Sequence, residues 1–180
     1  MTLPRLFLAG ACLSLCGCGL FGGADNPPLE VVPQVDISRY AGTWYEVASL
    51  PVSQQKGCNC TTAEYQRIDD ETIRVINRCR KGGPNGTVDE ATGKAFIVPG
   101  TNNAKLRVQF FWPFRGDYWV IDLDSAYTYA VVGVPNRKYF WILSRKPVMD
   151  EQLLTSLLGR LRERGFDTSR AQRTVHDCTD

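Results

Sequence analysis

Cysteine is the reactive residue type that dominates this chain of 180 residues, which contains seven cysteines but only one histidine, His176. A single imidazole limits both acid–base catalysis and metal binding, and the chain contains neither a Gly-x-Ser-x-Gly elbow nor a His-Glu-x-x-His motif. Seven thiols are many for a protein of a reducing compartment. The composition therefore points away from an enzyme and towards an exported protein with disulfide bonds.

An export signal occupies the first residues. One positive side chain, Arg5, precedes the apolar run Leu6–Leu15, which is about half the roughly 20 residues needed to span a bilayer. The run ends in Leu15-Cys16-Gly17-Cys18, which resembles the lipobox of bacterial lipoproteins. An ordinary signal peptide with chance cysteines is the alternative. The resemblance implies that residues 1–17 are removed as a signal peptide and that Cys18 becomes the acylated N-terminus.

The residue after the acylation site influences the membrane to which a lipoprotein is sorted. Gly19 stands there, and in known lipoproteins the absence of Asp at this position favours sorting to the outer membrane. Each CH₂ of an acyl chain on Cys18 would contribute roughly 0.8 kcal/mol to anchoring. The following residues, 19–33, are rich in Gly and Pro, as is typical of a linker. We therefore expect a lipidated tether over residues 18–34 and a folded domain over residues 35–180, lipid-anchored at the outer membrane.

The domain reads as a series of short strands followed by one helix. Pro147 is expected to open a helix, residues 151–164 carry leucines at helical spacing, and residues 170–175 could form a short final strand. The sequence predicts an all-β fold, an eight-stranded antiparallel up-and-down β-barrel with one C-terminal α-helix packed outside, while a sandwich stays open as the alternative. The eight strands are expected at residues 43–50, 60–68, 72–80, 91–98, 104–111, 116–123, 127–134 and 139–143.

Four landmarks within this domain resemble those of the bacterial lipocalins and their apolipoprotein-D-like relatives. The resemblance runs from about Val35 to the C-terminus and implies a barrel that binds a small hydrophobic ligand. It also implies structural roles for Gly42, Trp44 and Arg145, with the tryptophan closing the bottom of the barrel and the guanidinium lying over its indole face. The landmarks are Tyr40-Ala-Gly42-Thr-Trp44-Tyr45-Glu46, Val75-Ile-Asn77, Phe110-Phe-Trp-Pro-Phe114 and Trp141-Ile-Leu-Ser-Arg145.

Residues of a ligand cavity follow from strand alternation, because successive side chains point to opposite faces. Charged and amide neighbours such as Glu64, Arg74 and Arg107 should face water, which turns the residues between them inward. An inward amide such as Asn77 is costly unless it has a hydrogen-bond partner, which a ligand head group or an ordered water could supply. Relatives use a Tyr, an Asn and a Trp in their cavity, and the expected ligand-binding residues here are Tyr65, Asn77, Val108, Phe110, Tyr139 and Trp141.

Four cysteines of the domain, Cys58, Cys60, Cys79 and Cys178, allow three disulfide connectivities. Relatives bridge a cysteine matching Cys60 to one near the C-terminus, so the resemblance implies Cys60–Cys178 and leaves Cys58–Cys79. The second choice, Cys58–Cys178 with Cys60–Cys79, is disfavoured because alternation turns Cys60 outward and Cys79 inward, although a bulge would undo that argument. The Cys58-Asn-Cys60 spacing is not that of a usual zinc site. No metal and no cofactor are expected.

Three classes of function are open. The first is binding or carriage of a hydrophobic small molecule, such as a fatty acid or lysophospholipid, at the outer membrane in envelope maintenance or stress. The second is an envelope interaction or scaffold protein, for which residues 112–114 would supply an exposed aromatic patch. The third is a lipocalin-type enzyme. The net charge of +2 gives no reason to expect nucleic acid. The expected partners are the ligand and the membrane, and a homodimer is left open.

Overall fold

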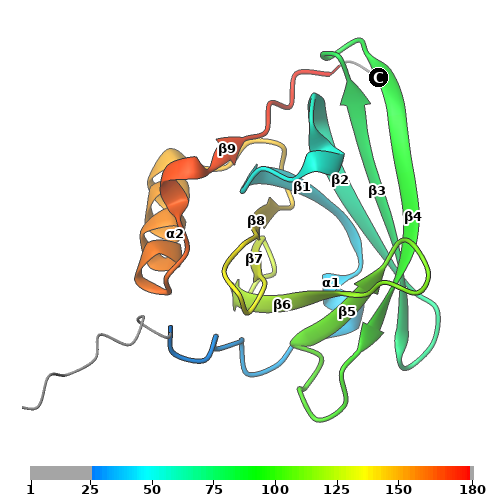
Figure 1. Cartoon of the computed structure of the whole chain (residues 1–180), viewed down its shortest axis with the longest axis vertical. Coiled ribbons are helices and arrows are strands. Elements are labelled where there is room, and N and C mark those ends of the chain that lie inside the picture. The colour runs from blue at the N-terminus through cyan, green and yellow to red at the C-terminus, as the bar shows by residue number, and fades with distance from the viewer. Residues whose placement is uncertain (1–25, 179–180) are drawn as a thin grey trace, which may run out of the picture.

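A nine-stranded antiparallel sheet forms most of the protein in the computed structural model, which describes residues 26–178. The sheet curls round on itself, and a single long helix lies against its outside (Figure 1). In chain order the elements are α1 (Ile37–Tyr40), β1 (Gly42–Ser49), the 3₁₀ turn η1 (Ser53–Gln55), β2 (Cys58–Arg67), β3 (Thr72–Lys81), β4 (Thr87–Ile97), β5 (Lys105–Gln109), β6 (Gly116–Leu123), β7 (Tyr129–Gly133), β8 (Phe140–Ser144), α2 (Glu151–Glu163), η2 (Thr168–Arg170) and β9 (Gln172–Arg173).

Strand β1 closes the sheet into a barrel. It pairs with β8 through residues 45–49 and with β2 through residues 42–45, while each strand from β2 to β7 pairs with the next strand along the chain. Strand β9 pairs with β1 at Ala48 and Ser49, where β1 has already separated from β2. The expected eight-stranded up-and-down barrel with an outside helix is confirmed, and the sandwich is excluded. The expected short final strand is β9, a ninth strand outside the barrel count.

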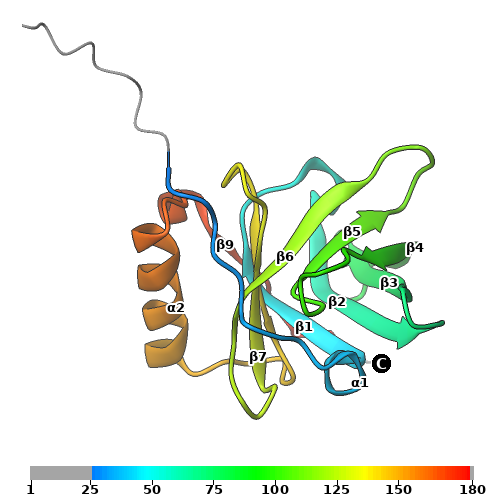
Figure 2. The ribbon, with the colours of Figure 1, turned by 90° about the horizontal axis from the view of Figure 1, so that it is seen from below.

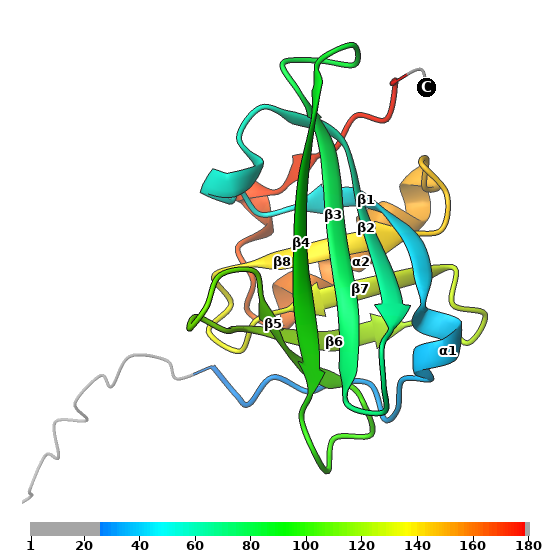
Figure 3. The same cartoon turned by 90° about the vertical axis from the view of Figure 1, so that its right-hand side faces the viewer.

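The barrel has two distinct ends, because connections between antiparallel strands alternate from one end to the other. The short helix α1 lies at one end, which we call the closed end. The β4–β5 and β6–β7 connections are hydrogen-bonded to the residues directly before α1. Asn103 Nδ2 donates to Val35 O (3.0 Å), and Asp36 N donates to Tyr127 Oη (2.8 Å). The other end, which we call the open end, carries η1 and the β5–β6 and β7–β8 connections (Figure 3).

Most element boundaries agree with the sequence expectations, with three differences. Strand β4 begins at Thr87, four residues before its expected start. Helix α2 begins after the N-cap Asp150, whose carboxylate accepts the Leu153 amide (2.9 Å), and not at Pro147. Helix α1 was not expected; the Asp36 carboxylate caps it.

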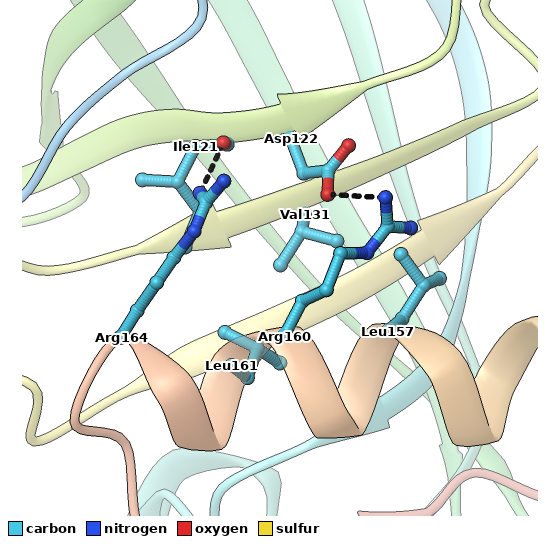
Figure 4. A pocket seen from close by; sticks show the side chains of 7 residues that line it. All are labelled: Ile121, Asp122, Val131, Leu157, Arg160, Leu161 and Arg164. Carbon is cyan, nitrogen blue, oxygen red and sulfur yellow. Dashed lines mark hydrogen bonds and ion pairs between the residues drawn. The ribbon is translucent and has the colours of Figure 1, made fainter.

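Helix α2 packs on the outer wall of the barrel. Its buried leucines, Leu154, Leu157 and Leu161, form a core with the outward faces of β1, β7 and β8 that is separate from the core inside the barrel. Arg160 of α2 and the C-cap residue Arg164 reach to β6, where Arg160 pairs with Asp122 at 3.3 Å (Figure 4). The cleft between helix and barrel leaves no room for a water molecule, so this interface is structural.

The second half of the expected tether is packed. Leu29 is buried among the side chains under α2, and the Val32 amide donates to the Val120 carbonyl of β6 (3.0 Å). Arg137 in the β7–β8 connection also donates to the Pro27 carbonyl. Residues 26–35 therefore form a strap that runs from the open end to α1 (Figure 2). Packed structure therefore begins before residue 35. The apolar side chains of this segment pack on the barrel, although their Gly- and Pro-rich sequence context is typical of a linker.

The expected signal peptide (residues 1–17), the lipobox and Cys18 lie outside the described residues. Within residues 26–178, no helix has both the length and the apolar character needed to cross a bilayer.

Candidate ligand-binding site

The closed end is sealed by Trp44 and Arg145. Trp44 is fully buried, and the guanidinium carbon of Arg145 lies 3.8 Å from the centre of its indole ring. This is the arrangement that the family resemblance implied. Gly42 has a φ of +91°, and a Cβ there would lie 3.4 Å from Arg145 Nη1. The Arg145 guanidinium also donates to the carbonyls of Arg39, Tyr40, Ala41 and Thr43.

Three tyrosines form the floor above this seal. The hydroxyl of Tyr118 is hydrogen-bonded to both Tyr40 Oη (2.7 Å) and Tyr65 Oη (2.8 Å). Burial raises the pKa of Tyr65 to about 12, and burial raises the pKa values of Tyr40 and Tyr118 well above their ordinary value. All three hydroxyls are neutral at physiological pH. Tyr65, expected as a polar ligand contact, has its hydroxyl already engaged at the closed end and is only 4% exposed.

The apolar inner wall becomes more accessible towards the open end. Ile73 and Leu106, near the closed end, are 1% exposed, whereas Val108, Phe110 and Trp141 are only partly buried, although they pack against the same inner core. Part of the surface of these three side chains is therefore accessible to solvent.

Phe110 and Trp141 line this wall from different strands. A Cβ at Gly93 of β4 would lie 2.8 Å from the Phe110 ring, so the glycine lets that ring lie directly on the strand. Trp141 stacks on Tyr139, with ring centres 6.1 Å apart and planes 26° apart. Tyr139 is 39% exposed and stands at the rim.

Asn77 lies on the inner face of β3, opposite Ala63 of β2 and Ala91 of β4. It is partly exposed, and its side-chain amide makes no hydrogen bond to another described residue. Small neighbours on both sides leave the amide accessible. The structure thus brings Asn77, Val108, Phe110, Tyr139 and Trp141 to the inner face or rim, and places Tyr65 beneath them.

A buried carboxylate, Glu46, was missed by the sequence reasoning. Glu46 is 6% exposed; its Oε1 accepts from Ser49 Oγ (2.8 Å) and Thr174 Oγ1 (3.0 Å), and its Oε2 accepts from Gln55 Nε2 (2.6 Å). It pairs in register with Leu143 of the inner core. The signal was available, because Glu46 is two residues from Trp44 and so shares its inward face.

Glu46 lies in a polar cavity of about 400 Å³ between β1, the β1–β2 connection and the C-terminal segment. The buried Oε1 of Gln55 beside it has no hydrogen-bond partner among the described residues. This oxygen is enclosed, and the Glu46 oxygens are already engaged by Ser49, Gln55 and Thr174. Its lining also includes Lys56, Thr61 and Arg173.

Two disulfides fix the strands around this cavity. The structure contains Cys58–Cys79 and Cys60–Cys178, the pairing preferred from the resemblance. A bulge in β2 between Asn59 and Thr62, with φ of +53° at Cys60, shifts the register. In a regular strand Cys58 and Cys60 would lie on the same face. The bulge places Cys58 on the inner face with Cys79, while Cys60 contacts the C-terminal segment.

The potential metal ligands and the histidine of this region make structural contacts. Within the described residues, the one grouping of potential metal ligands combines Asp177 with the sulfurs of Cys60 and Cys178, which are joined in a disulfide and are not thiolates. The sole histidine, His176, contacts the backbone carbonyl of Glu46 (2.7 Å) and packs edge-on against Tyr45. These contacts hold the C-terminal segment against β1.

Known sequences share this architecture over almost the whole domain. A family model described as a lipocalin-like domain matches residues 35–176. The Outer membrane lipoprotein Blc of Vibrio cholerae is 42% identical over 161 residues, covering 88% of this chain and 93% of that protein. Temperature-induced lipocalin-1 of Arabidopsis thaliana is 38% identical over 163 residues, covering 86% of this chain and 87% of that protein.

Solved structures agree with the fold. Insecticyanin from the tobacco hornworm Manduca sexta superposes with a TM-score of 0.65 at 25% identity, covering 82% of this chain and 84% of that one. Apocrustacyanin C2 superposes with a TM-score of 0.61 at 20% identity, covering 81% of this chain and 90% of that one, and shows the fold alone.

Proposed function

Because this chain belongs to the lipocalin-like domain family, we propose that it binds and carries a small hydrophobic ligand, a fatty acid or a lysophospholipid, in the open half of its barrel. The observation that carries the proposal is the gradient along the inner face. Side chains are buried and sealed at the closed end, while Val108, Phe110 and Trp141 expose apolar surface towards the open end. Burying such surface against an acyl chain contributes roughly 25 cal/mol per Å² before the costs of association.

The polar cavity favours one of the two ligand classes. The Glu46 carboxylate would repel the carboxylate of a bound fatty acid, whereas it would attract an ammonium group. Lys56 lines the same cavity with positive charge that suits a phosphate, and Arg173 beside it is paired with Glu151 at 2.6–2.7 Å. A zwitterionic lysophospholipid, with its head group in this cavity and its chain along Trp141 and Phe110, fits both signs of charge.

We propose the outer membrane as the location. Relatives in Vibrio cholerae and Escherichia coli are named outer membrane lipoproteins, and the lipobox-like Leu15-Cys16-Gly17-Cys18 supplies an acylation site in this chain. An acylated Cys18 would hold the barrel near the source of its ligand. Carriage of lipid within the envelope, in maintenance or stress, is the role that this location supports.

Titration of tryptophan fluorescence tests the ligand proposal. Lysophosphatidylethanolamine and oleate are each added to the parent protein and to Glu46→Gln. We expect both ligands to shift the emission, the lysophospholipid to bind more tightly to the parent, and the difference between the two ligands to shrink in Glu46→Gln. If neither ligand binds to the parent protein, the proposed function is contradicted. Equal affinities in the parent would contradict only the head-group assignment.

A further inference from the structure

Three aromatic side chains stand almost fully in solvent at the open end. Phe111, Trp112 and Phe114, in the connection between β5 and β6, are 74%, 86% and 77% exposed. Figures 2 and 3 show that this connection projects beside the β1–β2 and β7–β8 connections, away from α1. Exposed aromatic groups clustered in this way mark an interaction surface, and tryptophan is enriched where proteins meet the interface of a bilayer.

The hairpin connections differ in charge between the two ends of the barrel, while α1 and the β8–α2 connection add Arg39, Arg145 and Lys146 to the closed end. The four open-end connections, residues 50–57, 82–86, 110–115 and 134–139, carry four basic residues and no acidic one. The three hairpin connections at the closed end, residues 68–71, 98–104 and 124–128, carry four acidic residues and no basic one. The basic residues are Lys56, Arg115, Arg137 and Lys138, and the acidic residues are Asp69, Asp70, Glu71 and Asp124.

The strap brings the start of the described chain to the same end. Arg137 of the β7–β8 connection donates to the Pro27 carbonyl, so the chain enters the structure beside the open end (Figure 2). Eight residue steps separate Asn26 from Cys18, which is a reach of at most about 28 Å. A membrane anchor at Cys18 would therefore hold the open end close to the bilayer.

We propose that the open end of the barrel docks on an anionic phospholipid surface, with Phe111, Trp112 and Phe114 inserted at its interface and the basic connections over the head groups. Aromatic insertion and attraction of basic residues to anionic lipid act together at such surfaces. Docking turns the mouth of the ligand site towards the lipid and the acidic hairpin connections of the closed end away from it. Ligand binding within the barrel does not require this orientation, so the two proposals fail separately.

Depth-dependent quenching of Trp112 tests the docking. The full chain is purified as the cell processes it and mixed with vesicles of phosphatidylethanolamine and phosphatidylglycerol. Subtracting the emission of Trp112→Phe from that of the parent isolates Trp112. With vesicles, we expect the isolated emission to shift to shorter wavelength, to lose quenching by aqueous acrylamide and to gain quenching by lipids brominated in their acyl chains.

A second tryptophan position supplies the matched control. Val148 is 77% exposed, like Phe114, but follows β8 near the closed end. In a Trp112→Phe background, the tryptophan of Val148→Trp should keep its acrylamide quenching with vesicles. Unchanged acrylamide quenching of Trp112 would overturn the proposal. Protection of Trp112 without quenching by brominated lipid would also overturn it, because a protein or a second copy of the chain would then cover the patch.

The charge contribution is tested by a pair of reversals. Lys138 and Lys146 are both exposed, at the open end and beyond the closed end of β8 respectively. Lys138→Glu should weaken Trp112 protection on vesicles that contain phosphatidylglycerol, and Lys146→Glu should not. Equal effects of the two reversals would contradict a docked open end.

Discussion

Replacing Arg145 with alanine should destabilise the protein without changing the ligand affinity of the folded state. The guanidinium lies over Trp44 at 3.8 Å and donates to four backbone carbonyls at 2.7–3.2 Å. The cation–π contact contributes about 0.5–2 kcal/mol, and a hydrogen bond from a charged group contributes about 1.5–3 kcal/mol. The four bonds share one donor group, and the side chain is partly exposed, so water replaces some of them. We expect a net loss of about 3 kcal/mol in the free energy of unfolding.

Thermal unfolding measures this loss. For a domain of this size, a loss of about 3 kcal/mol lowers Tm by roughly 6–12 °C. Arg145→Lys keeps the charge but not the planar fork, so it should fall between the parent and Arg145→Ala. The neighbouring exposed Lys146 is the control, and Lys146→Ala should stay within about 0.5 kcal/mol of the parent. A loss below about 1 kcal/mol in Arg145→Ala would refute the view that this residue seals the barrel.

Three further outcomes follow from the same structure. The pKa of Tyr65 is raised to about 12 in the folded state, so its protonated hydroxyl contributes fully to the free energy of unfolding below the unfolded pKa near 10. This contribution is lost as the pH rises towards 12, by up to about 1.4 kcal/mol per pH unit. In urea unfolding, the stability of Tyr65→Phe should therefore fall less steeply with alkaline pH than that of the parent. The Cys60–Cys178 bridge spans 118 residues and the Cys58 bridge spans 21, so chain entropy predicts that losing the first by double alanine substitution costs about 5 kcal/mol and losing the second about 3, and urea titrations that reverse this order would contradict the model. Cys18→Ser should leave a soluble or unprocessed protein in cell fractionation, and a matured protein still in the outer-membrane fraction would disprove acylation at this residue.

Regular alternation along strands could be predicted from the sequence. It placed Val75, Asn77 and Val108 on the inner face, where the register of β2 to β5 also puts them. The alternation is a local property with a period of two residues, so it survives wherever strands pair without interruption.

Interruptions of the strands and contacts between residues far apart in the chain could not be predicted from the sequence. The bulge at Cys60 shifts the register because that residue adopts a positive φ, and a cysteine gives no signal in the sequence for such a conformation. The Tyr65 hydroxyl is engaged by Tyr118, 53 positions away, and only the closed barrel brings them together. Leu29 packs under α2 although its Gly- and Pro-rich context resembles a linker. In each case the tertiary structure, and not the local pattern, decides the outcome.

Native mass spectrometry of the gently purified protein tests the central claim, that the open half of the barrel holds a lipid. The account predicts one lysophospholipid or fatty acid per chain in the parent protein. Trp141→Ala, which removes apolar surface from the inner wall, should lose this bound mass at the same lipid concentration, while Val148→Ala on the outside should retain it. A parent protein that stays free of lipid even when lipid is supplied, or a Trp141→Ala variant that retains it fully, would contradict the account.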